Sequence, residues 1–431
     1  MRPGLFCFAV AISFAQQPAD VLERAQAQLT DAAGAVPKYT CTQTVDRSYF
    51  REVRQAGRAC DAIVANQRTG RSKLVLAATD RLRFDVEVAD GGYEIYGWPS
   101  AGRIATEKVE SLAGGGPLGT GPFGPFLVDI FTNPAVQFQY LGKKEALYEY
   151  RYRVPVAASH YRVQAGGTWR TTGYDGTFRL EPVSAALKQL TVRTLELLSN
   201  TSGCEATTIM DFEPLKIGAS EYVIPHQTRL QVIGRDAGFT ENATVYSACH
   251  EFHSESVVRF DDPVSQAAFG PKLHGDIRAQ RLPPGLPIVL ALDTEIDTDR
   301  AAAGDPVTAS VGKTLIDPIT KRVLAPAGSL VRGRITQLEH HIEGGKYFLV
   351  GLSFETLETP GETVPLSIIL NNAQQMQDPR TLTEVRGRIR PVVTTESRAG
   401  FHSGGTLLFP TNESRYVVPR GSILDWITLG E

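Results

Sequence analysis

Residues 114–131 read GGGPLGTGPFGPFLVDIF, a glycine-rich lead that runs into a short, strongly apolar segment. Glycine widens the range of allowed backbone angles, and proline interrupts helices and strands. We therefore predict a hinged flap whose apolar part starts at Phe126. The predicted hinge consists of Gly114, Gly115, Gly116, Gly119, Gly121 and Gly124.

The sequence on both sides of this flap has the period of two that is typical of β-strands. The clearest example is 80–88, in which apolar and charged residues alternate. Residues 18–35 instead carry apolar side chains at helical spacing, and a second helix is expected over 104–112. These patterns predict a mainly β protein with an α+β N-terminal half. Its fold would be a curved antiparallel open barrel with covering helices, followed by a C-terminal β-barrel or β-sandwich.

Turn signals divide the N-terminal half into a long antiparallel meander. We expect a turn at Gly142-Lys143 and a tight two-residue hairpin turn at Asp175-Gly176, because Asp-Gly is favoured in such turns. The predicted strands continue to about residue 250. Farther on, a Pro-x-Gly turn precedes an apolar run three times, at 283–285, 326–328 and 419–421, so each copy should start a strand.

A length of 431 residues favours two domains. We expect a signal peptide over 1–15, a curved sheet domain over 16–261, a linker over 262–287 and a C-terminal β domain over 288–431. Hydrophobic residues make up 42% and charged residues 21%, which is typical of a globular protein. The formal charge of −3 provides no overall basic field to attract nucleic acid or anionic lipid.

The first residues predict export to the periplasm or the extracellular space. Arg2 precedes a short apolar run over 5–14, and small residues at Ser13 and Ala15 indicate cleavage near Ala15. The run is too short to span a bilayer, and no later stretch approaches that length.

Four cysteines remain after this cleavage, and disulfides are their expected state in an oxidising compartment. Three pairings are possible. We favour Cys41 with Cys60 and Cys204 with Cys249, because each pair encloses one continuous patch of strand-like sequence. No C-x-x-C is present, so a redox or metal site is not expected.

Other motifs do not predict catalysis, a metal or a cofactor. Residues 119–124 spell G-x-G-x-x-G, but a helix-like pattern precedes them and Pro122 removes an amide that phosphate would need. His250 and His253 would point to opposite faces of a strand, and the adjacent His340 and His341 would also diverge. No G-x-S-x-G is present.

Two resemblances rest on particular segments. The segments GYDGTFRLEP (173–182) and IGASEYVIP (217–225) resemble the sheet of periplasmic lipoprotein-carrier proteins. That resemblance implies a half-open barrel that holds acyl chains. Residues 282–366, with AGDPVTASV (303–311) and DPITKRVLAPAGSLVRGR (317–334), resemble the C-terminal β-barrel of TrbI-type conjugal-transfer proteins. That second resemblance implies a protein-interaction module of the cell envelope without chemistry of its own.

From these observations we expect an exported, non-enzymatic envelope protein that binds an apolar or lipid-like ligand in its N-terminal domain. An alternative is an envelope scaffold or adaptor that contacts proteins through its C-terminal domain, and a secreted enzyme is a third hypothesis. The predicted ligand-binding residues are Tyr93, Tyr96, Trp98, Phe123, Phe126, Ile130 and Phe131.

Overall fold

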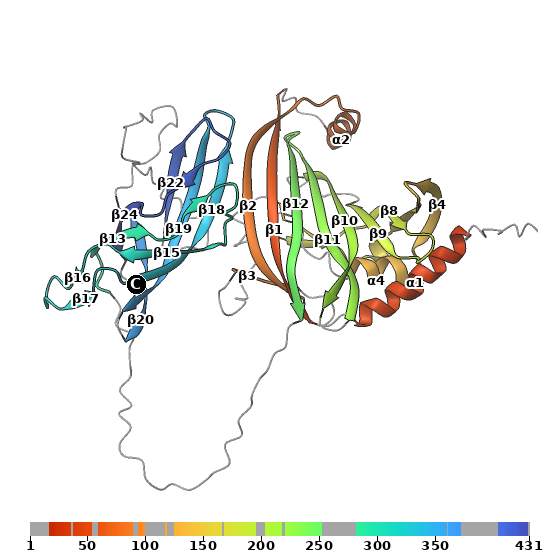
Figure 1. The fold of residues 1–431 in the computed structure, drawn as a ribbon. Helices are drawn as coiled ribbons and strands as arrows, with labels where there is room; N and C mark the ends of the chain where they lie inside the picture. Colours follow the sequence, from red (N-terminus) through yellow and green to blue (C-terminus); the bar gives the residue numbers. More distant parts are fainter. Residues whose placement is uncertain are drawn as a thin grey trace, which may run out of the picture.

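The computed structural model describes residues 17–35, 38–53, 59–88, 94–99, 117–118, 125–165, 168–194, 203–217, 220–251, 282–359, 361–371 and 404–429. These residues form mainly antiparallel β-structure, as predicted, and the sheet does not close into a barrel (Figure 1). None of the helices in these ranges is both long and apolar enough to cross a membrane.

The N-terminal part is a broad antiparallel sheet with the strand order β3-β2-β1-β12-β11-β10-β9-β8-β5-β4. Its strands are β1 (Tyr39–Glu52), β2 (Leu74–Val88), β3 (Glu94–Gly97), β4 (Gln137–Lys144), β5 (Leu147–Val154), β8 (Tyr174–Leu180), β9 (Leu187–Thr194), β10 (Gly203–Ile217), β11 (Ser220–Gly234) and β12 (Phe239–Glu251). A separate pair consists of β6 (Arg162–Ala165) and β7 (Thr168–Thr171), close to the short 3-10 helix η2 (Val156–Ala158).

Two helices cover one face of this sheet, which we call the helix face. Helix α1 (Pro18–Ala35) has the predicted bounds, and it packs beside α4 (Pro125–Thr132) (Figure 1). The Tyr150 hydroxyl on β5 donates a 2.6 Å hydrogen bond to the carbonyl of Pro18 at the start of α1. Buried side chains such as Phe178 and Met210 form the core between the helices and the sheet. The opposite face, which we call the polar face, carries the other residues of each alternation.

The C-terminal strands form a second core. Their bounds are β13 (Pro287–Leu292), β14 (Ile296–Asp297), β15 (Pro306–Val311), β16 (Leu315–Ile316), β17 (Val323–Ala325), β18 (Leu330–His341), β19 (Tyr347–Thr359), β20 (Glu362–Pro365), β21 (Ile368–Leu370), β22 (Gly405–Pro410), β23 (Val417–Val418) and β24 (Ile423–Thr428). The three Pro-x-Gly turns directly precede β13, β18 and β24, as predicted. Gly285, Gly328 and Gly421 have φ values of 77°, 85° and 85°, a region that glycine adopts without strain.

Strand β2 joins the two groups of strands. Residues 78–80 of β2 pair with 339–341 of β18, and Leu82 bridges to Ala303. The Arg83 guanidinium forms an ion pair with the Asp305 carboxylate next to this bridge. The two halves are therefore held together by shared sheet hydrogen bonds.

Two turn predictions were wrong. The β4–β5 turn lies at Glu145 and Ala146, which both have positive φ, three residues beyond the expected Gly142-Lys143. The Asp175-Gly176 dipeptide lies inside β8. Residue 176 is a glycine because a Cβ there would stand 1.8 Å from the Thr191 carbonyl oxygen on the adjoining strand. This glycine therefore allows close strand packing and does not form a turn. The helix expected over 104–112 lies outside the described residues.

All four remaining cysteines form disulfides, but the favoured pairing was wrong. Cys41 bonds to Cys249, and Cys60 bonds to Cys204. Strand β1 pairs with β12 across the meander, so Cys41 meets a residue 208 positions away. The two disulfides fit an exported protein, because such bonds persist in oxidising compartments.

Candidate functional site

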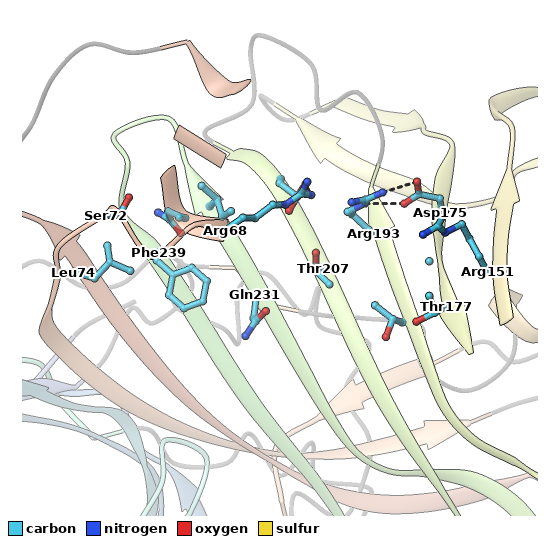
Figure 2. Close-up of a pocket in the computed structure, with 16 residues that line it drawn as sticks. Arg68, Ser72, Leu74, Arg151, Asp175, Thr177, Arg193, Thr207, Gln231 and Phe239 are labelled. Atoms are coloured by element: carbon cyan, nitrogen blue, oxygen red, sulfur yellow. Dashed lines mark hydrogen bonds and ion pairs between the residues drawn. The ribbon is translucent and has the colours of Figure 1, made fainter. Parts of the chain in front are cut away.

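A cavity of about 670 Å³ lies on the polar face of the sheet, beside the short helix α2 (Cys60–Arg68) (Figure 2). We call it the α2 cavity. Its volume is within the range of roughly 300–1,000 Å³ typical of small-molecule sites. It is lined by Gln67, Arg68, Gly70, Ser72, Leu74, Arg151, Asp175, Gly176, Thr177, Thr191, Arg193, Glu205, Thr207, Gln231, Ile233 and Phe239.

Leu74 and Phe239 lie at one end of the cavity (Figure 2). Ile233 also lines the cavity, as do Gln67 and Arg68 of α2. Ile233 and Phe239 are cross-strand partners on β11 and β12, and both pack in the small core that contains Ile63 of α2. An apolar molecular surface would lose contact with water at this end.

Three contacts hold α2 over the sheet. The Cys60–Cys204 disulfide ties its first residue to β10. The Gln67 side-chain amide donates a 3.2 Å hydrogen bond to the carbonyl of Ala237, and the Arg68 guanidinium pairs with the Glu205 carboxylate. The helix therefore has a fixed place at the rim of the cavity.

The other end of the cavity is charged. Arg193 on β9 and Asp175 on β8 are direct cross-strand partners that form a two-pronged ion pair, with N–O distances of 2.7 and 2.6 Å. The Asp175 hydrogen bond raises the pKa of Arg193 above its usual value. Arg151 on β5 lies beside this pair and makes no ion pair with any described residue (Figure 2). With both lining carboxylates already paired to arginine, Arg151 leaves one positive charge available.

Polar side chains line the floor between the two ends. Thr177, Thr191, Thr207 and Gln231 come from four successive strands. Beside Leu74, the buried Ser72 hydroxyl has no hydrogen-bond partner among the described residues (Figure 2). Four strand spacings separate β12 from β8, a distance of roughly 19 Å at about 4.8 Å per strand. The cavity is therefore an elongated groove that changes from apolar to positively charged along its length.

The residues predicted to bind a ligand lie elsewhere. The rings of Tyr96 and Trp98 pack against Phe84, with centroids 6.2 and 5.7 Å from that of Phe84. Burial is the main cause of the raised pKa of Tyr96, and the nearby Glu94 carboxylate raises this pKa further. The ring of Phe126 lies 5.5 Å from that of Tyr174. Tyr93 and Phe123 lie outside the described residues, as do all six predicted hinge glycines.

The apolar part of the predicted flap is helix α4, and Ile130 and Phe131 are buried within its core. Asp129 of α4 accepts a 3.0 Å hydrogen bond from the backbone N–H of His160, and its other oxygen lies 2.6 Å from the His160 ring. None of the five described residues of the predicted site lines the α2 cavity. Tyr96 and Trp98 pack in one core and the three α4 residues in another.

The α2 cavity was not predicted because its residues are spread over seven strands and one helix, without a local motif. The one sequence feature that could have indicated the cavity is the run of basic residues at alternate positions that includes Arg151. From sequence alone, such a run cannot be distinguished from an ordinary solvent-exposed face of a sheet.

The histidines singled out in the sequence take separate places. His340 stacks on Phe348, and His341 stacks on Tyr347 while its ring nitrogen lies 2.9 Å from a Glu339 oxygen. In the described ranges, no three His, Cys, Asp or Glu side chains are grouped to hold a metal ion. His253 lies outside those ranges.

Comparisons with known proteins show a distant likeness to solved structures. No protein-family model matches the chain, and no curated protein matches it. Among solved structures, it is similar to a DUF1329 family protein from Desulfovibrio piger, with 10% sequence identity and a TM-score of 0.16. The match covers 55% of this chain and 94% of that protein. The lipoprotein-carrier and TrbI-type resemblances stay predictions.

Proposed function

We propose that this chain is a non-enzymatic binding protein of the cell envelope that holds a small amphipathic anion in the α2 cavity. One observation carries this proposal: a groove of about 670 Å³ has apolar side chains at one end and, at the other, an arginine that forms no ion pair with any described residue. An apolar tail or ring would lie against Phe239, and an acidic group would contact Arg151. Guanidinium groups bind carboxylate, sulfonate or phosphate oxygens through charge-assisted hydrogen bonds.

The lining supports binding over catalysis. Asp175 and Glu205 are its only described carboxylates, and each is paired with an arginine, so neither is placed to take a proton from a substrate. The described lining contains no histidine, cysteine or lysine. The proposed ligand is more specific than the apolar or lipid-like one expected from the sequence, because the cavity lies on the polar face and includes Arg151 in its lining.

The test uses cis-parinaric acid, a fluorescent fatty acid whose long hydrocarbon chain and carboxylate can reach Phe239 and Arg151 together. We expect saturable binding to the purified protein. Arg151→Ala should weaken that binding about tenfold or more, since a charged hydrogen bond contributes roughly 1.5–3 kcal/mol. Fluorescence titration measures the dissociation constant.

Arg153→Ala is the matched control, because Arg153 lies two residues along β5 and outside the cavity lining. The uncharged dye N-phenyl-1-naphthylamine separates the apolar contribution to binding from that of the charge. Its affinity should fall with Phe239→Ala and stay constant with Arg151→Ala. Equal effects of Arg151→Ala and Arg153→Ala on the binding of cis-parinaric acid would contradict the proposed site.

A further inference from the structure

A small hairpin on the C-terminal domain exposes apolar side chains to water. Strands β16 and β17 form it, and Figure 1 shows them at the outer margin of the C-terminal strands, on the side away from β2. Ile316 and Val323 are cross-strand partners with exposed fractions of 48% and 61%. Ile319, in the turn between them, is 88% exposed.

The hairpin has a fixed shape. Leu315 and Ala325, at its base, are buried in the C-terminal core. In the turn, the Asp317 carboxylate accepts hydrogen bonds of 2.8 and 3.0 Å from the backbone N–H groups of Ile319 and Thr320. These bonds lower the pKa of Asp317, the Thr320 bond most of all. The same bonds fix the shape of the turn that carries Ile319.

Three basic residues lie close in sequence to this apolar tip. Lys313, Lys321 and Arg322 are all exposed, and Asp317 is the hairpin's only acidic residue, with its carboxylate already bonded to the turn backbone. Single exposed aliphatic residues are common on protein surfaces. Three of them on one positively charged hairpin form an apolar patch with adjacent positive charge, which is typical of a binding surface. Apolar side chains next to lysine and arginine suit the interface of an anionic bilayer. There the apolar tip would enter the boundary of the acyl chains, and the cations would bind headgroup phosphates.

We propose that the β16–β17 hairpin binds the surface of an anionic lipid membrane. The overall charge of −3 does not attract the whole molecule to such a surface, so the local patch must orient it. The inference is independent of the α2 cavity, which lies in the N-terminal part.

The test is flotation of the full chain with vesicles of phosphatidylcholine alone, or of phosphatidylcholine and phosphatidylglycerol in equal amounts. We expect binding to the phosphatidylglycerol vesicles that weakens as salt is added. The pair Ile319→Ser and Val323→Ser should lower the partition coefficient about tenfold, and the pair Lys321→Gln and Arg322→Gln should do the same. Val183→Ser, at a valine that is 72% exposed in the N-terminal part, is the matched control and should change nothing.

Absence of binding to the anionic vesicles would overturn the proposal, as would equal binding to both vesicle types. Equal loss in the Val183→Ser control would also overturn it, because that result would assign the effect to general surface hydrophobicity. If the chain ignores vesicles but forms a dimer that Ile319→Ser disrupts, the hairpin is a contact between two copies and the lipid proposal is wrong.

Discussion

Asp80→Ala is expected to lower the free energy of unfolding by about 3–5 kcal/mol. The Asp80 carboxylate on β2 accepts hydrogen bonds from Nε and Nη2 of Arg47 on β1, both 2.7 Å long, and a third of 3.2 Å from the Tyr49 hydroxyl. The Arg47 side chain is 0% exposed, so removing the carboxylate would leave a buried positive charge without this ion pair. Urea unfolding followed by circular dichroism measures the change.

A second ion pair on the same two strands is the control. Asp46 and Arg81 also face each other across β1 and β2, but on the polar face, where the Asp46 side chain is 51% exposed. Asp46→Ala should cost at most about 1 kcal/mol. The double variant Arg47→Met with Asp80→Leu should recover most of the loss, since an apolar pair of similar volume avoids the desolvation penalty. Similar losses for Asp80→Ala and Asp46→Ala would contradict this account.

Replacing Cys60 and Cys204 together by serine should lower the free energy of unfolding by about 3–5 kcal/mol and also weaken ligand binding. The bond closes a separation of 144 residues and ties the start of α2 to β10. A nine-residue helix is marginal on its own, so without this bond α2 should detach from the rim and leave Ile233 and Phe239 exposed to water. Titration with cis-parinaric acid should show a dissociation constant at least tenfold larger.

The other disulfide separates stability from binding. Cys41 and Cys249 link β1 and β12, which stay paired along most of their length by backbone hydrogen bonds. Replacing both by serine should destabilise the protein to a similar degree while leaving the affinity for cis-parinaric acid unchanged at temperatures where the variant is folded. Unchanged affinity after loss of Cys60–Cys204 would show that α2 does not shape the site.

Local patterns predicted many elements and failed where a distant strand decided the outcome. The helix over 18–35 and the starts of β13, β18 and β24 depend on spacing and on Pro-x-Gly turns, which act within a few residues. Asp175-Gly176 has the local signature of a turn, but the carbonyl of Thr191 requires a residue without a Cβ at Gly176. A glycine that serves turn geometry and one that serves close packing look the same in a sequence.

By itself, the sequence determined the class of this protein: alternating β-strands, an N-terminal amphipathic helix and repeated strand-starting turns. These features follow from side-chain periodicity and backbone limits, which neighbouring residues set. Only the tertiary structure decided which cysteines bond, where the Arg47–Asp80 pair is buried and which face carries the cavity. Those outcomes depend on strand order, because antiparallel pairing places residues far apart in the chain next to one another, and no local pattern encodes that order.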